Sequence, residues 1–407
     1  MRIQDAVSRR KFMGAVSAAM GFLGLAPQGE LIASSLLQGR GQRGQRAGQA
    51  GDQGGRRNAE DYDALAKLAN NENPYGPSES VTKAMTDAFK YANRYGYPDG
   101  GVNQAIAQHH NLKPENILTG AGSGEILNAA GQAFLKDHKL VVGAEPTYGS
   151  VFSVASGIKK DAIRVPLLPD YRLDIPGIIK ATHTHYRDVG FVYICNPNNP
   201  TGVIVTKQEI QQLLDGIPGD VPVLIDEAYH HYVNDPNYAT SVPYVIEGRP
   251  VIVARTFSKI AALAGVRFGY ALAPRELIEQ MRTYSTGSTS ALAKWAVVAS
   301  LKDGENEAKV KSVTLALREK TMAQLKDMGY DVIPSQANFF MVHVKTDITP
   351  VIEEFRKRKV LVGRKFPPMD EYLRVSVGNE SEMDRFIAAF KEISPGRQQA
   401  QATKTSA

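Results

Sequence analysis

Short apolar runs alternate with stretches of helical periodicity between about residues 120 and 273. This alternation constrains the fold more than any other feature of the chain. The runs at 189–195, 221–225, 251–254 and 268–272 are typical of buried strands. Strand, helix and strand in this order predict a mostly parallel sheet with helices on both faces. Because such sheets bind ligands at the carboxyl ends of their strands, we expect the functional residues there.

The length of the chain predicts two domains. With 407 residues, of which 43% are hydrophobic, it exceeds the usual size of a single domain. After residue 300 the pattern changes to charged helices, followed by apparent strands at 339–344 and 372–377. We therefore expect an N-terminal segment (61–90) that contributes to a small domain, a large domain (91–300), a C-terminal small α+β domain (301–394) and a disordered tail (395–407).

The first 60 residues differ in composition from the rest. Arg9 and Arg10 are followed at two positions by Phe12, and a weakly apolar run extends to Pro27. This layout is similar to a twin-arginine export signal over residues 1–27, which predicts a periplasmic or exported protein. The alternative is a basic N-terminus without an export role, and the protein would then be cytoplasmic. The segment 28–60, rich in Gly, Gln and Arg, predicts a disordered linker.

The positive charge of the chain lies in this leader. Nine Lys and Arg stand against three Asp and Glu in residues 1–58, whereas the remainder is balanced, although the whole chain carries +6. A neutral body argues against nucleic acid as a partner. No apolar run is long enough to span a membrane, so we expect no stable membrane anchoring. Cys195 is the only cysteine, which rules out an intramolecular disulfide.

A lysine lies between hydroxyl side chains and an arginine. Thr256, Ser258 and Lys259 follow the apolar run 251–254, and Arg267 comes eight residues after the lysine. This pattern suits an amine that bonds to a carbonyl group beside a phosphate. The arginine and hydroxyls would hold the phosphate, and their field would favour the neutral, nucleophilic amine. On its own, a Ser-Lys pair is more often a solvated loop lysine.

Polar residues follow two other predicted strands. Asp226 comes directly after the run 221–225, where its carboxylate could pair with a protonated ring nitrogen of a cofactor. Tyr229, three residues later, could donate a hydrogen bond to the same ring. The alternative is an ordinary helix start capped by the aspartate. The turn 196–202, with two prolines and a glycine, projects asparagine amides after the run 189–195, and its alternative is an ordinary loop.

A glycine-rich turn at 120–125 opens a helical stretch. Its small residues would let backbone amides at the helix N-terminus approach a phosphate closely. The turn lacks the spacing of the dinucleotide-binding fingerprint, so by itself it is weak evidence. It gains weight because it occurs together with the three motifs above, in a fixed order along the chain.

These four motifs in this order resemble the fold-type I pyridoxal-phosphate (PLP) enzymes of the class I/II aminotransferase superfamily. Within it the match is closest to histidinol-phosphate aminotransferases. Matching stretches also occur at 71–77, 146–148 and 373–378, and the resemblance covers about residues 65–393. It implies an α/β fold with a mostly parallel seven-stranded sheet in the large domain. It further implies PLP as the cofactor, no metal, and amino transfer between a small amino donor and a 2-oxo acid acceptor.

The resemblance also implies a role for each matching residue. Lys259 would form the Schiff base with PLP and act as general acid and base, with Asp226 at the pyridine nitrogen. Asn199 and Tyr229 would bind the phenolic oxygen of the cofactor, and Tyr148 would stack on its ring. The expected phosphate ligands are Thr256, Ser258, Arg267, the amides around Ser123 and Gly124, and Tyr75 of a second subunit, which implies a homodimer.

The substrate side of the expected site departs from the family pattern. Arg374 would clamp the carboxylate of the substrate, and its alternative role is a surface arginine at a sheet edge. The segment 362–369 reaches Arg374 over a shorter distance than is typical of histidinol-phosphate enzymes. Arg364 is therefore the candidate contact for a distal substrate group, and we expect an altered substrate. The alternatives are a decarboxylase similar to threonine-phosphate decarboxylase and a PLP-binding protein without turnover.

Overall fold

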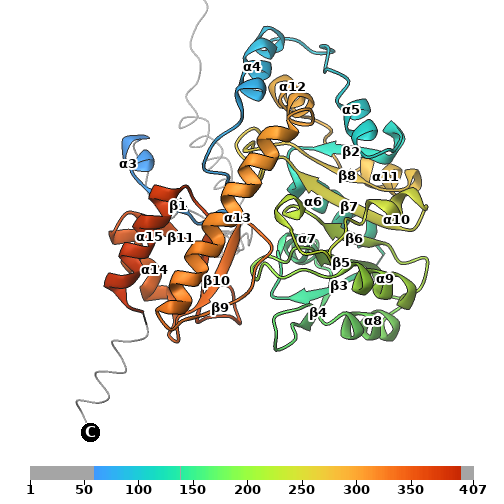
Figure 1. The fold of residues 1–407 in the computed structure, drawn as a ribbon. Helices are drawn as coiled ribbons and strands as arrows, with labels where there is room; N and C mark the ends of the chain where they lie inside the picture. Colours follow the sequence, from blue (N-terminus) through green and yellow to red (C-terminus); the bar gives the residue numbers. More distant parts are fainter. Residues whose placement is uncertain (1–58, 138, 396–407) are drawn as a thin grey trace, which may run out of the picture. The chain divides into compact units, whose positions relative to one another are not determined.

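Seven strands form the largest sheet of the computed structural model, which describes residues 59–137 and 139–395. The strand order is β2-β8-β7-β6-β5-β3-β4, and only β8 runs opposite to the others. The predicted mostly parallel seven-stranded sheet is thus confirmed (Figure 1). The strands are β2 (Ile117–Gly120), β3 (Leu140–Glu145), β4 (Ala162–Pro166), β5 (Val189–Cys195), β6 (Val223–Asp226), β7 (Val251–Thr256) and β8 (Gly269–Leu272).

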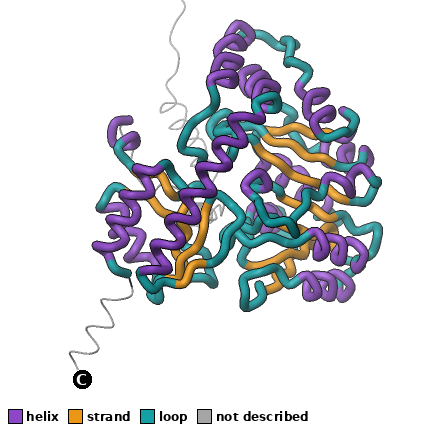
Figure 2. Tube along the Cα trace, in the orientation of Figure 1, coloured by secondary structure: helices purple, strands orange, loops and turns teal. Residues whose placement is uncertain are grey.

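Helices cover both faces of this sheet, as the ribbon and the tube both show (Figures 1 and 2). Successive residues of a strand point to opposite faces. In β5, Val192 and Ile194 accordingly belong to one hydrophobic core, and Phe191 and Tyr193 belong to the other. Helices that contribute to the first core are α5 (Val102–His109), α8 (Ile175–Thr184), α9 (Lys207–Gly216), α10 (Val242–Ile246) and α12 (Ala291–Ser300). The second core contains residues of α6 (Ser123–Phe134), α7 (Ser150–Gly157) and α11 (Arg275–Arg282).

The strand ends that matter for function differ slightly from the predicted ones. β5 has the predicted bounds, whereas β6 begins two residues late, at Val223. β7 continues past the predicted end at Ala254, because Arg255 and Thr256 pair with Tyr270 and Gly269 of the antiparallel strand β8. Helix α9 begins with a capping box, in which the side chains of Thr206 and Glu209 each accept a hydrogen bond from the backbone N–H of the other.

A separate hydrophobic core surrounds two small sheets. In one of them β1 (Ala66–Leu68) runs parallel to β11 (Val360–Val362), and the other has the antiparallel order β12-β10-β9. The remaining elements of this part are β9 (Asp331–Val332), β10 (Phe339–His343), β12 (Tyr372–Ser376), α13 (Gly304–Asp327), α14 (Ile348–Lys357) and α15 (Glu380–Ile393). Shorter segments elsewhere are α3 (Ala59–Asp63), η1 (Phe89–Tyr91), η2 (Pro114–Asn116) and η3 (His230–Tyr232).

The segment 61–90, predicted to contribute to the small domain, contains residues of both the small and the large hydrophobic core. Ala66 and Leu68 of β1 lie in the small core, but α4 (Glu79–Ala88) packs against α12. Val81 of α4 is part of the large core. Helix α4 therefore packs on the core of the large sheet. The predicted domain boundaries stay predictions.

The ends of the chain fall mostly outside the described residues. The predicted export signal (1–27), the predicted linker up to residue 58, and the tail from 396 to 407 are not described. Helix α3 begins at Ala59, one residue before the predicted end of the linker at residue 60. Within 59–137 and 139–395, every helix is too short or too polar to cross a membrane. The same residues contain no cluster of three or more side chains suited to hold a metal ion.

Candidate active site

One cavity of about 460 Å³ collects nearly all the predicted site residues at the carboxyl ends of β5, β6 and β7. Such a volume suits a small-molecule site. Tyr75 is the exception among the predicted residues. The predicted residues that line the cavity are Ser123, Gly124, Tyr148, Asn199, Asp226, Tyr229, Thr256, Ser258, Lys259, Arg267, Arg364 and Arg374.

Lys259 lies half-buried in this cavity, in the loop after β7. Its Nζ donates a hydrogen bond of 2.9 Å to the carbonyl oxygen of Asn70. Burial, and then the charge of Arg374, lower the pKa of Lys259 to about 8, while Glu72 and Asp226 act in the opposite direction. At pH 7 about a tenth of this amine is therefore unprotonated and able to act as a nucleophile or base, far more than for an ordinary lysine.

Asp226 is the last residue of β6 and is 2% exposed. It accepts hydrogen bonds from the hydroxyl of Tyr193 at 3.4 Å and from the N–H of Ala228 at 3.2 Å. Burial raises the pKa of Asp226 to about 6, because these two long bonds do not offset the lost hydration of the carboxylate. A cationic ring nitrogen in the cavity would stabilise the carboxylate, which is the partner that PLP offers.

The hydroxyl of Tyr229 is held by two asparagines. It accepts from Nδ2 of Asn71 at 3.1 Å and from Nδ2 of Asn199 at 3.3 Å. Burial raises the pKa of Tyr229, so the group keeps its proton at neutral pH. Since both asparagine bonds use the lone pairs of the hydroxyl oxygen, its O–H is left to donate toward the cavity.

Arg374 reaches the cavity from β12 of the small sheet and is 7% exposed. Its Nη1 donates to Oδ1 of Asn199 at 2.7 Å, and its Nη2 donates to the carbonyl oxygen of Ala69 at 2.6 Å. Nε is buried and has no hydrogen-bond partner among the described residues. Burial lowers the pKa of Arg374 to about 10, so it stays a cation at neutral pH. Donors remain on this guanidinium for an anionic ligand.

One recess of the cavity lies at the N-terminus of α6, where Ser123 and Gly124 line it. Gly122 caps this helix with φ of 88° and no side-chain acceptor, so the first amides stay available. A Cβ at position 122 would lie 2.3 Å from Nη2 of Arg267, which explains the glycine. Arg267 donates to the carbonyl oxygens of Ala121 and Ala264, at 3.1 and 2.9 Å. The hydroxyl of Thr256 donates to that of Ser258 at 2.8 Å, which places both hydroxyls in the same cavity.

The residues present therefore fit PLP. The recess at α6 suits its phosphate, Asp226 suits its ring nitrogen, and the O–H of Tyr229 suits its phenolic oxygen. Lys259 supplies the amine for its aldehyde. The individual roles of these side chains stay predictions, but the geometry brings together the groups that each role requires.

Two of the predicted site residues, Tyr75 and Arg364, lie away from the centre of the cavity. Tyr75 is 45% exposed and does not line the cavity of its own chain. Its predicted role in a second subunit is compatible with this exposure but stays a prediction. Arg364 lies at the exposed rim, with its guanidinium 4.2 Å from the ring centroid of Phe366 and Nη1 bonded to the carbonyl oxygen of Lys365.

Sequence reasoning missed two residues that support the site. Asn71 was part of a matching stretch but received no role. Its backbone N–H donates to the hydroxyl of Ser376 on β12, which in turn donates to Oδ1 of Asn71, both at 2.8 Å. Tyr193 was hidden in an apolar strand. Its signal was positional, since it lies on the same face of β5 as Cys195, whose neighbour in β6 is Asp226.

Comparison with known proteins places the chain in one family. Residues 64–390 match the family model "Aminotransferase class I and II". The histidinol-phosphate aminotransferase of Caldicellulosiruptor saccharolyticus is 35% identical over 340 residues, which cover 81% of this chain and 92% of that protein. The aromatic amino acid aminotransferase of Rhodococcus jostii is 33% identical over 335 residues, covering 81% of this chain and 90% of that protein.

A solved structure gives the same result. The histidinol-phosphate aminotransferase of Sinorhizobium meliloti, in complex with pyridoxal-5'-phosphate, superimposes with a TM-score of 0.75 at 25% identity. The alignment covers 81% of this chain and 91% of that one. Together with the fit of the cavity to PLP, these matches show that the chain belongs to the class I and II aminotransferases and is a PLP-dependent transaminase.

Proposed function

We propose that this transaminase takes its amino group from a small amine that also carries a phosphate or carboxylate, with histidinol phosphate as the first candidate. The observation that most supports this proposal is the presence of two arginines on the substrate side of the cavity. Arg267 adjoins the recess for the cofactor phosphate, so Arg364 and Arg374 are left for the substrate. Two guanidinium groups can hold one phosphate with charge-assisted hydrogen bonds. The histidinol-phosphate aminotransferases among the relatives support the same choice.

The side chains of the cavity divide the work of amino transfer among them. PLP, when bound, supplies an electron sink for the negative charge that develops at the substrate carbon. Asp226 would keep the ring nitrogen protonated, and the hydroxyl of Tyr229 would donate a hydrogen bond to the phenolic oxygen. Nζ of Lys259, with its pKa of about 8, would accept the proton from the substrate carbon and would then donate it to the aldehyde carbon of the cofactor. Arg374 holds the anionic group so that this C–H bond faces Lys259.

An aromatic amino acid is the second candidate substrate. The Rhodococcus jostii relative is an aromatic amino acid aminotransferase with nearly the same identity. Phe366 lines the cavity beside Arg364 and could contact an aromatic ring. In this case Arg374 alone would bind the carboxylate, and Arg364 would contribute little.

Substitution of Arg364 separates these candidates. For Arg364→Gln we expect kcat/KM with histidinol phosphate to fall by about 10- to 100-fold, as for the loss of one charged hydrogen bond. Activity with phenylalanine or tyrosine should change less than about 3-fold. The matched control is Arg358→Gln, which removes an arginine bonded to Glu354 and Glu392 away from the cavity. Equal losses for both substrates, or no turnover of histidinol phosphate by the parent enzyme, would contradict the proposal. Release of carbon dioxide from phosphorylated amino acids would favour the decarboxylase instead.

We also propose that the enzyme is a homodimer in which Tyr75 completes the site of the partner. The exposure of Tyr75 supports this role. Lys259→Ala and Tyr75→Ala chains should each be impaired, whereas mixed and refolded chains should regain about a quarter of the parental activity. The reason is that half of the dimers are hybrids with one intact site each. A mixture that is no more active than the two separate variants would show that each active site is built from one chain.

For the leader, we propose that Arg9 and Arg10 direct export by the twin-arginine route. The arginine pair and the apolar run behind it support this role. The full chain should appear in the periplasmic fraction of its host, and an Arg9→Lys, Arg10→Lys variant should remain in the cytoplasm. Identical fractionation of the two proteins would refute an export role for the pair.

A further inference from the structure

A buried ion pair lies directly behind the cofactor site. Nη2 of Arg255 is 2.7 Å from Oε2 of Glu227, and the two side chains are 6% and 0% exposed. Nε of Arg255 donates to the same carboxylate oxygen at 3.2 Å. The hydroxyl of Thr240 donates to Oε2 at 2.9 Å, and the N–H of Ser241 donates to Oε1 at 2.6 Å. Both charges are therefore satisfied inside the protein.

The pair joins the two strand ends that carry the chemistry. Glu227 follows Asp226 at the end of β6, and its N–H continues the ladder by donating to the carbonyl oxygen of Ala254 at 2.9 Å. Arg255 precedes Thr256 at the end of β7. Because successive residues alternate between the faces of a sheet, Asp226 and Thr256 line the cavity, whereas Glu227 and Arg255 meet on the opposite side.

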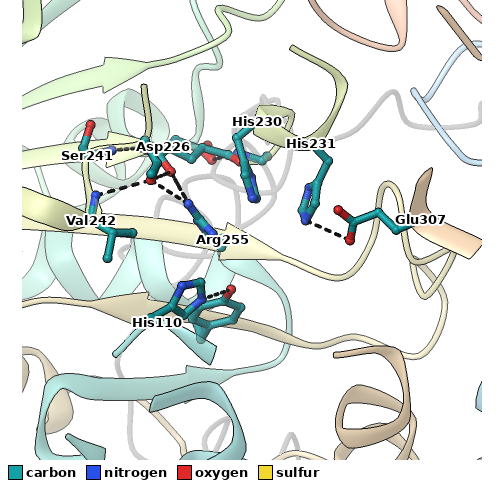
Figure 3. Close-up of polar contacts among 12 residues, drawn as sticks. His110, Asp226, His230, His231, Ser241, Val242, Arg255 and Glu307 are labelled. Atoms are coloured by element: carbon teal, nitrogen blue, oxygen red, sulfur yellow. Dashed lines mark hydrogen bonds and ion pairs between the residues drawn. The ribbon is translucent and has the colours of Figure 1, made fainter. Parts of the chain in front are cut away.

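Three imidazoles lie around the cationic end of this pair, and a fourth, that of the exposed His109, lies beside His110. His109 and His110 come from the end of α5, and His230 and His231 from the turn after Tyr229. Figure 3 shows His110, His230 and His231 around Arg255. The ring centroids of His230 and His231 are 3.6 Å apart, and those of His109 and His110 are 4.8 Å apart.

Three of these imidazoles make polar contacts with Glu227 after β6, with β8 and with α13. Nδ1 of His230 lies 2.7 Å from the carbonyl oxygen of Glu227, and Nε2 of His110 lies 2.8 Å from the hydroxyl of Tyr270 on β8. Nε2 of His231 lies 3.8 Å from Glu307 of α13. Burial, and then the charge of Arg255, lower the pKa of all four histidines. At neutral pH Arg255 is accordingly the cation that bonds Glu227, within a shell of neutral imidazoles.

We propose that Glu227 and Arg255 form a positioning pair that fixes the ends of β6 and β7, so that Asp226 and Lys259 keep their relative places in the cofactor site. The pair touches neither cofactor nor substrate. It acts through the backbone of the two strands, which are hydrogen-bonded to each other as far as Glu227 and Ala254. This role is independent of which amine the enzyme uses.

Acid should weaken the pair through the histidines. The other ionisable groups that face the cluster are Tyr238, Tyr270, Glu307 and Lys311. Since the folded protein holds these imidazoles below their ordinary pKa, they stay neutral in it while the unfolded chain takes up protons below about pH 6.5. The contribution of these histidines to the free energy of unfolding is therefore fully present above about pH 6.5 and decreases as the pH falls below it. Protonated imidazoles would also repel Arg255 at the site itself.

The test replaces the pair without leaving a lone buried charge. A Glu227→Leu, Arg255→Met double variant keeps the volume of the pair, and Arg255→Lys keeps the charge but loses the planar fork. The control is Asp215→Asn, Arg249→Met, which removes a partly exposed pair with a contact of 2.9 Å. Each holoenzyme is assayed for the dissociation constant of PLP, for the pH titration of the absorbance of the lysine-bound cofactor, and for melting temperature.

We expect the double variant to fold, but to bind PLP at least about 10-fold more weakly and to shift the absorbance midpoint by about half a pH unit or more. Arg255→Lys should change the dissociation constant of PLP and the absorbance midpoint in the same directions, but by smaller amounts. The control should change neither quantity. The proposal is overturned if the folded variants bind and titrate PLP as the parent does. It is also overturned if neither variant folds, because the pair would then serve the fold and not the site.

Discussion

A Lys259→Ala variant will transfer amino groups at least about 10⁴-fold more slowly than the parent, because it loses both the amine that bonds the cofactor and the base that moves the proton. The fold should survive, since Nζ makes a single hydrogen bond within residues 59–137 and 139–395, to the carbonyl oxygen of Asn70. Removing the partly buried ammonium group also removes the small free-energy cost of its desolvation. The measurement is single-turnover conversion of the amino donor, together with the melting temperature.

The matched control for this prediction is Lys357→Ala. Lys357 lies on α14, bonds Glu354 at 2.6 Å and is far more exposed, with no place in the cavity. It should keep the parental rate within about 2-fold, as is usual for a surface substitution. A Lys259→Ala enzyme within about 10-fold of the parent, with the control behaving as expected, would show that another group performs the chemistry.

An Asp226→Asn variant should lose about 10³-fold in rate while the protein without cofactor becomes more stable at pH 7. The rate falls because a neutral amide cannot keep the ring nitrogen cationic. The stability rises because burial raises the pKa of Asp226 to about 6, so that ionised Asp226 destabilises the cofactor-free protein above that pH. The unfavourable contribution is on the order of 3 kcal/mol at most at pH 7 and vanishes as the carboxyl is protonated near pH 4.

Asp220→Asn is the control for this second prediction. Asp220 also accepts a hydrogen bond from a tyrosine, Tyr186, at 2.9 Å, but both residues are exposed. The control should change neither the rate nor the pH dependence of the melting temperature. The prediction would be wrong if Asp226→Asn kept more than a tenth of the parental rate, or if it destabilised the cofactor-free protein at pH 7.

The sequence predicted the sheet and the location of the site because both depend on local patterns. Buried parallel strands are continuous apolar runs, so 189–195 had the correct bounds, and ligand-binding residues follow such strands. The end of β7 was placed too early because Arg255 looks like a residue outside a strand. Its charge is matched by Glu227, which lies 28 positions away in sequence. A local sequence pattern cannot predict this ion pair between Arg255 and Glu227.

The supporting side chains of the site could not be predicted for the same reason. Asn71 bonds Tyr229 across 158 positions and Ser376 across 305, so its role exists only after the small sheet packs against the large one. Tyr193 looked like an ordinary core residue of β5 until its hydroxyl was seen to reach Asp226. The placement of α4 was likewise decided by the long-range contact with α12.

Borohydride reduction of the purified holoenzyme, followed by peptide mass spectrometry, tests the central assignment most directly. We expect a single stable cofactor adduct, attached to the peptide that contains Lys259, which disappears when an amino donor is added before the reductant. An adduct on another lysine, or none on a cofactor-loaded protein, would show that Lys259 does not hold the cofactor.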